Sequence, residues 1–324
     1  MRGERSEVSV QRIDWGLALD KYGIFLVFLA ICVILSFLSP AFLTVRNVLN
    51  VLRQVSITGI MGVGMTFVIL TGGIDLSVGS LLALAGCLAA GLEVRHGASL
   101  FLMVIIPILV VTCLGVLVGF IISKFKVPPF VATLGMMSAA RGLTLIYTDA
   151  YPISGLSRSF RALGSGMVGP VPVPIIIYIV VVILGAIVLS QTKFGRYVYA
   201  IGGNEEAVRL SGIPTSRYKI AIYGISAFTA ALSGVILAAR LNSGQPTAGQ
   251  GYELDVVAAV VIGGTSLQGG RGSVLGTFIG ALLIGVLTNG FNLMNISPFY
   301  QQVVKGAIIV AAVIMEQMRS KQKD

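Results

Sequence analysis

Few residues in this sequence could do chemistry, and the most unusual of them are charged groups within long apolar stretches. A charged side chain at membrane depth is costly, so it is usually functional or paired. Asp75 either caps a helix that begins near Leu76 or belongs to a gate, where Gly72 and Gly73 interrupt the apolar stretch. Arg141 lies well inside another stretch, as a buried partner for a carboxylate or as part of the same path.

A second group of polar side chains surrounds a short apolar segment late in the chain. Its members are Asn242, Gln245, Glu253 and Asp255. The backbone there is glycine-rich and either lines a cavity, where irregular backbone is tolerated, or forms an ordinary outside loop. Asn289, Asn292 and Asn295 are spaced by three, which suits interhelical hydrogen bonds or the hydroxyl groups of a bound solute. Lys305 is expected to snorkel towards an outer interface.

The motifs of the common enzyme classes do not occur in this sequence. It contains no G-x-x-x-x-G-K-[ST] phosphate loop, no G-x-S-x-G elbow and no H-E-x-x-H zinc motif. The three cysteines lie inside apolar runs without a second ligand at metal spacing, and there is one histidine. We therefore expect neither an enzyme nor a metal site, and no cofactor in this chain.

The elements that must position these residues are membrane helices. The chain is 56% hydrophobic and 11% charged, whereas a soluble domain carries about 25% charged residues. Its net charge is +10, but the basic residues lie in short loops between apolar runs. This pattern is typical of proteins in a lipid bilayer and argues against a nucleic-acid partner.

The apolar runs predict an all-α, polytopic fold with about ten transmembrane helices. The predicted spans are Gly23–Leu38, Ile57–Leu70, Leu76–Leu92, Leu100–Ser123, Val131–Tyr147, Pro174–Ser190, Ile220–Ala239, the short Leu254–Gly263, Val274–Phe291 and Gln302–Met315. The segment Thr44–Ser56 is expected to be a separate amphipathic piece near the interface. A faint similarity between residues 68–86 and 260–281 hints at a duplicated half.

The distribution of basic residues favours cytoplasmic termini. With both ends inside, 15 of the 23 Lys and Arg residues fall on the cytoplasmic side and six outside. The whole chain, residues 1–324, is then one transmembrane domain. Its cytoplasmic parts are an N-terminal tail (1–21), a loop (191–219) and a C-terminal tail (317–324).

The largest cytoplasmic loop contains a short helix with both ends marked. Asn204 is a favourable N-cap, and Glu205 and Glu206 suit the first turn. Gly212 suits the left-handed position after the last turn, and Pro214 prevents continuation. Any loop can contain such a helix, but if the chain is a transporter, a rigid cytoplasmic helix is a docking element for a separate ATPase, since the chain has no phosphate loop of its own. The candidate coupling residues are Asn204, Glu205, Glu206, Ala207, Arg209, Leu210, Ser211 and Gly212.

Four ordered segments resemble a known family. The stretch from Gly195 to Ile213 resembles the coupling-helix region of ribose-type sugar permeases, which are membrane subunits of ATP-binding-cassette importers. The other similar segments are Thr71–Ser80, Phe130–Met137 with Arg141-Gly142, and Gln245–Leu267. Together they extend the similarity over roughly residues 22–315.

The resemblance implies an import function and a set of partners. The chain would form the translocation pathway for a monosaccharide, ribose or a related sugar, in a bacterial cytoplasmic membrane. Its partners would be a second permease subunit in a homodimer, a cytoplasmic ATP-binding subunit that carries ATP and Mg, and an extracytoplasmic sugar-binding protein. The alternative is a secondary carrier driven by protons or ions, which would need protonatable or ion-coordinating groups in mid-membrane.

Overall fold

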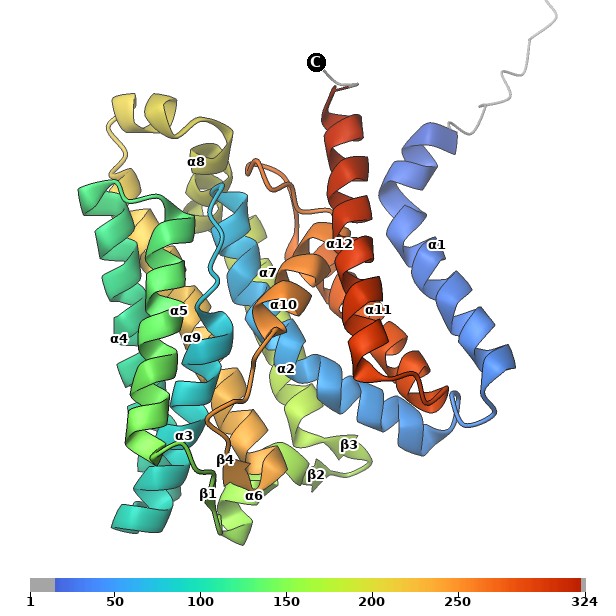
Figure 1. The fold of residues 1–324 in the computed structure, drawn as a ribbon. Coiled ribbons are helices and arrows are strands. Elements are labelled where there is room, and N and C mark those ends of the chain that lie inside the picture. Colours follow the sequence, from blue (N-terminus) through green and yellow to red (C-terminus); the bar gives the residue numbers. More distant parts are fainter. Residues whose placement is uncertain (1–14, 322–324) are drawn as a thin grey trace, which may run out of the picture.

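The computed structural model describes residues 15–321, and over this range the chain is built almost entirely from helices (Figure 1). The helices are α1 (Trp15–Leu38), α2 (Val45–Leu70), α3 (Val78–His96), α4 (Leu100–Phe125), α5 (Pro129–Thr148), α6 (Arg158–Ser165), α7 (Val173–Gln191), α8 (Lys193–Leu210), α9 (Thr215–Leu241), α10 (Tyr252–Ile262), α11 (Val274–Leu293) and α12 (Pro298–Lys321). Two antiparallel pairs of very short strands join β1 (Ile153–Ser154) to β4 (Ser243–Gly244), and β2 (Met167–Val168) to β3 (Val171–Pro172).

The predicted all-α, polytopic fold is confirmed. Among the described residues, seven helices are long and apolar enough to cross a membrane: α2, α3, α4, α5, α7, α9 and α11. Each of the ten predicted apolar segments overlaps one helix, and α10 is indeed short, with 11 residues. The number of ten spans stays a prediction.

The predicted interfacial segment Thr44–Ser56 is not a separate element. It is the first half of α2, a single helix of 26 residues. The Thr44 side chain caps this helix by accepting a hydrogen bond from the Asn47 amide at 3.4 Å. Residues 45–57 contain neither proline nor glycine, so nothing in the local sequence ends the helix before the apolar half begins.

Two halves of the chain have the same order of elements in opposite orientation. In the first half α2 ends, an extended segment (71–77) follows, and α3 begins in the interior of the molecule (Figure 1). In the second half α9 is followed by the segment 242–251 and then by α10. Helices α3 and α4 pack on α9, whereas α10 and α11 pack on α2. This exchange is typical of an inverted repeat, α2–α5 against α9–α12.

The weak similarity between residues 68–86 and 260–281 pairs different helices from those that the structure relates. It matched the end of α2 with the end of α10, whereas the structure matches α2 with α9. The glycine-rich turns after α2 and after α10 produce that similarity, because both need small residues where the backbone bends.

The buried centre consists of α2, α3 and α9. The apolar windows of these helices are 78%, 72% and 72% buried, whereas only 17% of the α5 window is buried. Close packing explains the glycine content here, because a Cβ on Gly234 of α9 would collide with the Leu82 carbonyl of α3. The exposed apolar surfaces of α4, α5 and α7 are therefore free to face lipid or another subunit.

The start of α1, the helix α8 and the end of α12 lie at the same end of the molecule, and α6 with the strands lies at the opposite end (Figure 1). Helix α1 begins at Trp15 and α12 reaches Lys321, so both helices extend into the segments predicted as tails. Residues 1–14 and 322–324 of those tails lie outside the described range.

Candidate functional site

A cleft borders the break between α9 and α10. Asn242 ends α9 in a left-handed conformation with φ of 55°, and the chain stays irregular until α10 begins. Beside this break lies a cleft of about 420 Å³, a size that suits a small ligand. Its lining residues are Gln54, Leu237, Arg240, Leu241, Gln245, Thr247, Ala248, Gly249 and Tyr252.

The lining of this cleft combines hydrogen-bonding groups with apolar surface. Two amides, a hydroxyl, a phenol and a guanidinium can bond to hydroxyl groups, and none of the nine lining residues is acidic. Leucine and alanine side chains supply an apolar wall. This combination suits a neutral, polyhydroxylated solute better than an inorganic cation.

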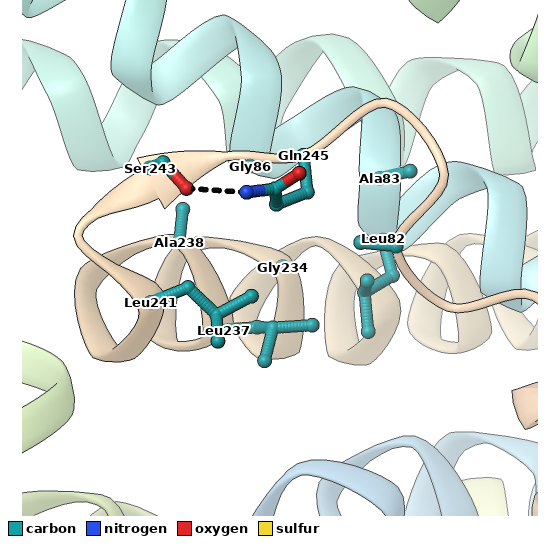
Figure 2. A pocket seen from close by; sticks show the side chains of 10 residues that line it. Leu82, Ala83, Gly86, Gly234, Leu237, Ala238, Leu241, Ser243 and Gln245 are labelled. Carbon is teal, nitrogen blue, oxygen red and sulfur yellow. Dashed lines mark hydrogen bonds between the residues drawn. The ribbon is translucent and has the colours of Figure 1, made fainter. Parts of the chain in front are cut away.

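Gln245 connects the cleft to a much smaller pocket between α3 and α9. Figure 2 shows its Nε2 atom donating to the Ser243 Oγ atom, and these two atoms are 2.8 Å apart. The pocket below them has a volume of about 10 Å³, which is about the space of one water molecule. Of these two pockets, the larger cleft is the one with space for a solute.

Arg141 holds the irregular segment from the neighbouring helix α5. Its Nη1 atom donates to the carbonyl oxygens of Pro246 and Ala248, at 2.5 and 2.9 Å. The expected carboxylate partner is thus replaced by backbone carbonyls. The reason is that a non-helical segment leaves carbonyls without helical partners, and the guanidinium satisfies two of them at once.

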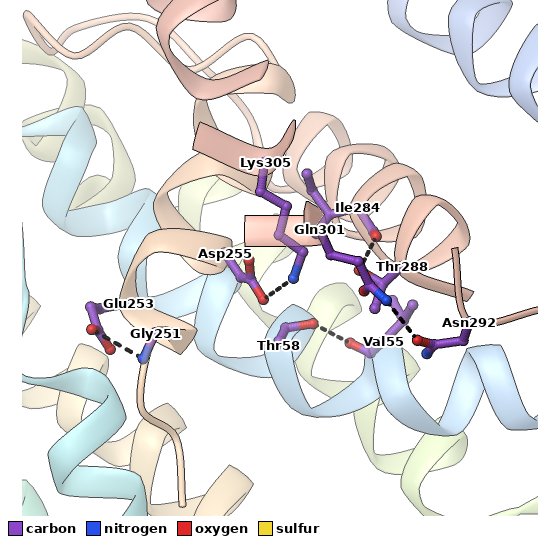
Figure 3. Close-up of polar contacts among 10 residues, drawn as sticks. All are labelled: Val55, Thr58, Gly251, Glu253, Asp255, Ile284, Thr288, Asn292, Gln301 and Lys305. Carbon is purple, nitrogen blue, oxygen red and sulfur yellow. Dashed lines mark hydrogen bonds and ion pairs between the residues drawn. The ribbon is translucent and has the colours of Figure 1, made fainter. Parts of the chain in front are cut away.

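The first turn of α10 carries both predicted acidic residues, and they do different things (Figure 3). The Glu253 Oε1 atom accepts from the Gly251 amide at 3.2 Å, so this side chain supports the start of the helix. Asp255 forms an ion pair with Lys305 of α12 at 2.9 Å, and both side chains are about one-fifth exposed, at 18% and 20%. The expectation that Lys305 snorkels is wrong, because its ammonium turns inwards to this partner.

The asparagine stripe at the end of α11 is engaged in helix packing. Asn289 and Asn47 of α2 exchange two amide hydrogen bonds of 2.9 Å each. Asn292 accepts a hydrogen bond from Gln301 of α12, also at 2.9 Å (Figure 3). Asn295 lies beyond the helix with φ of 55°. Of the two alternatives, the structure shows interhelical hydrogen bonds at the first two positions.

The break between α2 and α3 is closed by contacts within the segment and with α9 and α5. Gly72 adopts φ of 73°, and a Cβ on Gly73 would lie 2.5 Å from the Tyr223 hydroxyl of α9. Asp75 is 2% exposed, and its Oδ1 atom accepts from the Ser77 amide and hydroxyl at 3.0 and 2.5 Å. Its Oδ2 atom accepts from Ser226 of α9 at 2.7 Å. Asp75 therefore links Ser77, the N-cap residue of α3, to α9, although its side chain bonds to no amide of α3 itself. Its role in a gate stays a prediction.

The predicted short helix exists and is the second part of α8. The backbone leaves helical geometry at Asn204, with φ of −159° and ψ of 96°, so α8 is two helices joined at a kink. The Asn204 Oδ1 atom accepts from the Ala207 amide at 2.9 Å, which confirms the predicted N-cap. Gly212 takes φ of 82° directly after the last turn. The helical segment 193–203 before the kink was not predicted.

The side chains of this short helix are mostly exposed. Glu206 and Arg209 form an ion pair at 2.5 Å, and the hydrogen bond from Arg209 lowers the pKa of Glu206. Glu205 pairs with Lys219 near the start of α9. Leu210 is 77% exposed, so this helix presents an apolar side chain at its surface.

The structure thus brings together only some of the predicted site residues. Gln245 lines the cleft, Asn242 ends the helix beside it, and Arg141 tethers its wall. Four further lining residues were not predicted: Gln54, Arg240, Thr247 and Tyr252. Polar residues such as Gln54 inside a helix are a usable signal, but Gln54 was assigned to the supposed interfacial segment. Among the described residues, no three His, Cys, Asp or Glu side chains are grouped to hold a metal ion.

Comparisons with known proteins agree with this architecture. The family model described as "Branched-chain amino acid transport system / permease component" matches residues 47–313. The chain is 48% identical to the ribose import permease protein of Bacillus subtilis (strain 168), over 99% of this chain and 100% of that protein. It is 47% identical to the ribose import permease protein of Escherichia coli (strain K12), over 89% and 91%.

A third relative is named for a different sugar. The D-allose transport system permease protein of Escherichia coli (strain K12) is 38% identical over 98% of each chain. No solved structure matches. The matching family model, the full-length relatives and the seven long apolar helices among the described residues show that this chain is a multi-pass membrane protein and belongs to the family described as branched-chain amino acid transport system / permease component.

Proposed function

We propose that this chain is the membrane-spanning permease subunit of an ATP-binding-cassette importer and forms the translocation pathway for ribose or a related sugar. The cleft of about 420 Å³ beside the α9–α10 break carries this proposal, because its lining can bond to several hydroxyls at once. A single such hydrogen bond contributes about 1 kcal/mol, so a few of them hold a solute without trapping it. The relatives named for ribose import support the choice of sugar.

The end of the molecule that carries α8 faces the cytoplasm in this proposal. Basic residues gather there on α8 and the start of α9, as the orientation rule for cytoplasmic segments requires. Single cysteines in place of Ser211 and Ser320 should then react only from the cytoplasmic side. Reaction of both from outside in intact cells would reverse the orientation.

The short helix after Asn204 is the docking element for a cytoplasmic ATP-binding subunit, which carries ATP and Mg. Its support is the combination of firm caps with an exposed surface that includes Leu210. Ala207→Asp should lower recovery of the ATP-binding subunit on purification, together with uptake. Ala200→Asp is the matched control, because Ala200 is exposed on the same helix before the kink. Equal recovery with both variants would refute docking at this helix.

The remaining partners follow from the same proposal. The exposed apolar surface of α5, only 17% of whose window is buried, suits contact with a second copy of the permease in a homodimer. An extracytoplasmic sugar-binding protein would deliver solute at the opposite end, where α6 and the strands lie (Figure 1). Crosslinking of single cysteines placed on α5 tests the homodimer.

Reconstitution separates ATP-driven import from the secondary-carrier alternative. The charged groups that such a carrier would need are already engaged, Arg141 with carbonyls and Asp255 with Lys305. Vesicles that contain the permease, its cognate ATP-binding subunit and the sugar-binding protein should take up labelled ribose with ATP. Uptake driven by a proton gradient without ATP would overturn the proposal.

A further inference from the structure

Three segments that are distant in sequence meet at one backbone contact beneath α8. They are the end of α2 at Leu70, residue Gly202 of α8, and Gly270 in the loop between α10 and α11. The Gly270 amide donates to the Leu70 carbonyl at 2.9 Å. A Cβ on Gly202 would overlap both the Leu70 oxygen and the Gly270 nitrogen. We call this contact of Leu70, Gly202 and Gly270 the glycine junction.

Neighbouring contacts hold the first part of α8 to the same two segments. The Tyr199 hydroxyl, almost one turn before Gly202, donates to the Gly272 carbonyl at 2.8 Å. The ring of Phe194 lies 6.2 Å from the ring of Phe67 on α2, between centroids. The segment 193–203 is therefore bound to α2 and to the α10–α11 loop at once, whereas the segment after Asn204 is exposed.

The position of the glycine junction matters because it touches both halves of the inverted repeat. Leu70 is the last residue of α2, and the break before α3 follows it directly. The loop that contains Gly270 follows α10, the short helix beside the cleft. One patch of α8 thus contacts the residue directly before the first break and the loop at the far end of α10, the helix that follows the second break. Figure 1 shows these segments at the same end of the molecule.

We propose that the glycine junction transmits movement of α8 to α2, which precedes the first break, and to α10, which follows the second, so that Gly202 and Tyr199 are positioning residues for coupling ATP hydrolysis to import. This inference rests on the proposed docking of the ATP-binding subunit at the helix after Asn204. Backbone packed directly on backbone suits the task, because close-packed contacts deform little and pass displacement on. A side chain between the segments could change rotamer and absorb it.

The test compares two adjacent glycines in the complete reconstituted complex with its ATP-binding subunit and sugar-binding protein. Gly202→Ala places a methyl group inside the junction, whereas a Cβ on Gly203 meets nothing within 4 Å. The measured quantity is ribose imported per ATP hydrolysed. We expect it to fall roughly tenfold in Gly202→Ala, the scale of overpacking a fitted contact, and to stay unchanged in Gly203→Ala.

Tyr199→Phe keeps the test decisive if the Gly202 variant does not reach the membrane. It removes one hydrogen bond and adds no atoms, so it should insert normally. Uptake per ATP should fall by about two- to tenfold, the effect of one lost hydrogen bond. A wild-type ratio in Tyr199→Phe, or in a Gly202→Ala protein that does insert, overturns the inference.

Recovery of the ATP-binding subunit distinguishes this inference from the proposed function. The inference predicts normal recovery with Gly202→Ala and Tyr199→Phe, because the docking helix is untouched. Loss of recovery with Gly202→Ala would place this contact in the docking surface and overturn transmission. Normal recovery with Ala207→Asp would refute the docking on which the inference rests, whereas an unchanged uptake-per-ATP ratio with normal recovery in Gly202→Ala would overturn transmission alone.

Discussion

The two breaks in the helical backbone, residues 71–77 and residues 242–251, are held in different ways. The segment 71–77 is closed around Asp75, which is 2% exposed and bonded to Ser226 of α9, and Thr133 of α5 donates to the Ile74 carbonyl at 3.2 Å. The segment 242–251 borders an open cleft and is tethered from outside by Arg141 of α5. Helix α10, which follows it, is tethered by Lys305 of α12.

This difference indicates a division of labour between the halves. The first break is closed around the buried, hydrogen-bonded Asp75 carboxylate, so it has little room to change when a distant helix moves. The second break borders an open cleft, and its tether to Arg141 and the Lys305 pair of α10 let it follow α5 and α12 when they move. We therefore expect the second break to respond to the transport cycle and the first to act as a fixed packing point, and four experiments test this difference.

The largest effect is expected from breaking the ion pair of α10. Lys305→Met leaves Asp255 as an unpaired charge within the membrane, and loss of one partner of a buried pair costs about 3 kcal/mol. The thermal stability of the purified protein and its uptake should both fall. Adding Asp255→Asn should restore most of the stability, because the unpaired charge is gone. A double variant no better than Lys305→Met would mean that the pair is not what holds α10.

The second-largest effect is expected from replacing Arg141, because this residue provides two charge-assisted hydrogen bonds to the wall of the cleft. Arg141→Met should weaken the tether by about 2 kcal/mol. Uptake should then fall roughly thirtyfold, mainly through a higher half-saturation concentration for sugar, since the wall that carries Gln245 and Thr247 becomes mobile. Arg141→Lys keeps a cation and should lie between the two. Wild-type uptake in Arg141→Met would show that these two hydrogen bonds do not hold the wall of the cleft in place.

A smaller and purely steric effect is expected from a substitution at Gly73, in the first break. Gly73→Ala directs a methyl group at the Tyr223 hydroxyl, 2.5 Å away, and should cost about 1–3 kcal/mol. The hydroxyl of Tyr223 has no hydrogen-bond partner among the described residues, so Tyr223→Phe alone should be nearly neutral. Combining the two should recover stability, as a thermal unfolding series can measure. Without recovery, the close contact with Tyr223 is not the reason for glycine at position 73.

The smallest effect concerns single contacts to the solute. Gln54→Ala removes one amide from the cleft lining and should lower apparent sugar affinity about fivefold, the scale of one hydrogen bond. Gln268→Ala is the matched control, because Gln268 is exposed in the loop between α10 and α11, away from the cleft. Equal affinities for the two variants in an uptake assay would show that Gln54 does not contact the sugar.

Local features of the fold were predictable from single stretches of sequence. The helix after Asn204 was predicted with its cap and its glycine stop, because both devices act within four residues. The apolar runs predicted where helices lie, since each run must satisfy its own backbone within the membrane. The division of α2 at residue 56 failed because a change from polar to apolar residues does not end a helix.

The partners of the charged and amide residues were decided only by tertiary structure. Arg141 and Lys305 gave no sign of whether they would meet carbonyls, a carboxylate or water, because their partners come from segments distant in sequence. The cleft likewise joins Gln54 of α2 to Tyr252 of α10. The sequence by itself determined the apolar helices, their caps and the breaks between them, since these depend on contacts within a few residues. The inverted arrangement of the two halves decided which side chains meet. It packs α3, which follows the first break, against α9, and α10, which follows the second break, against α2.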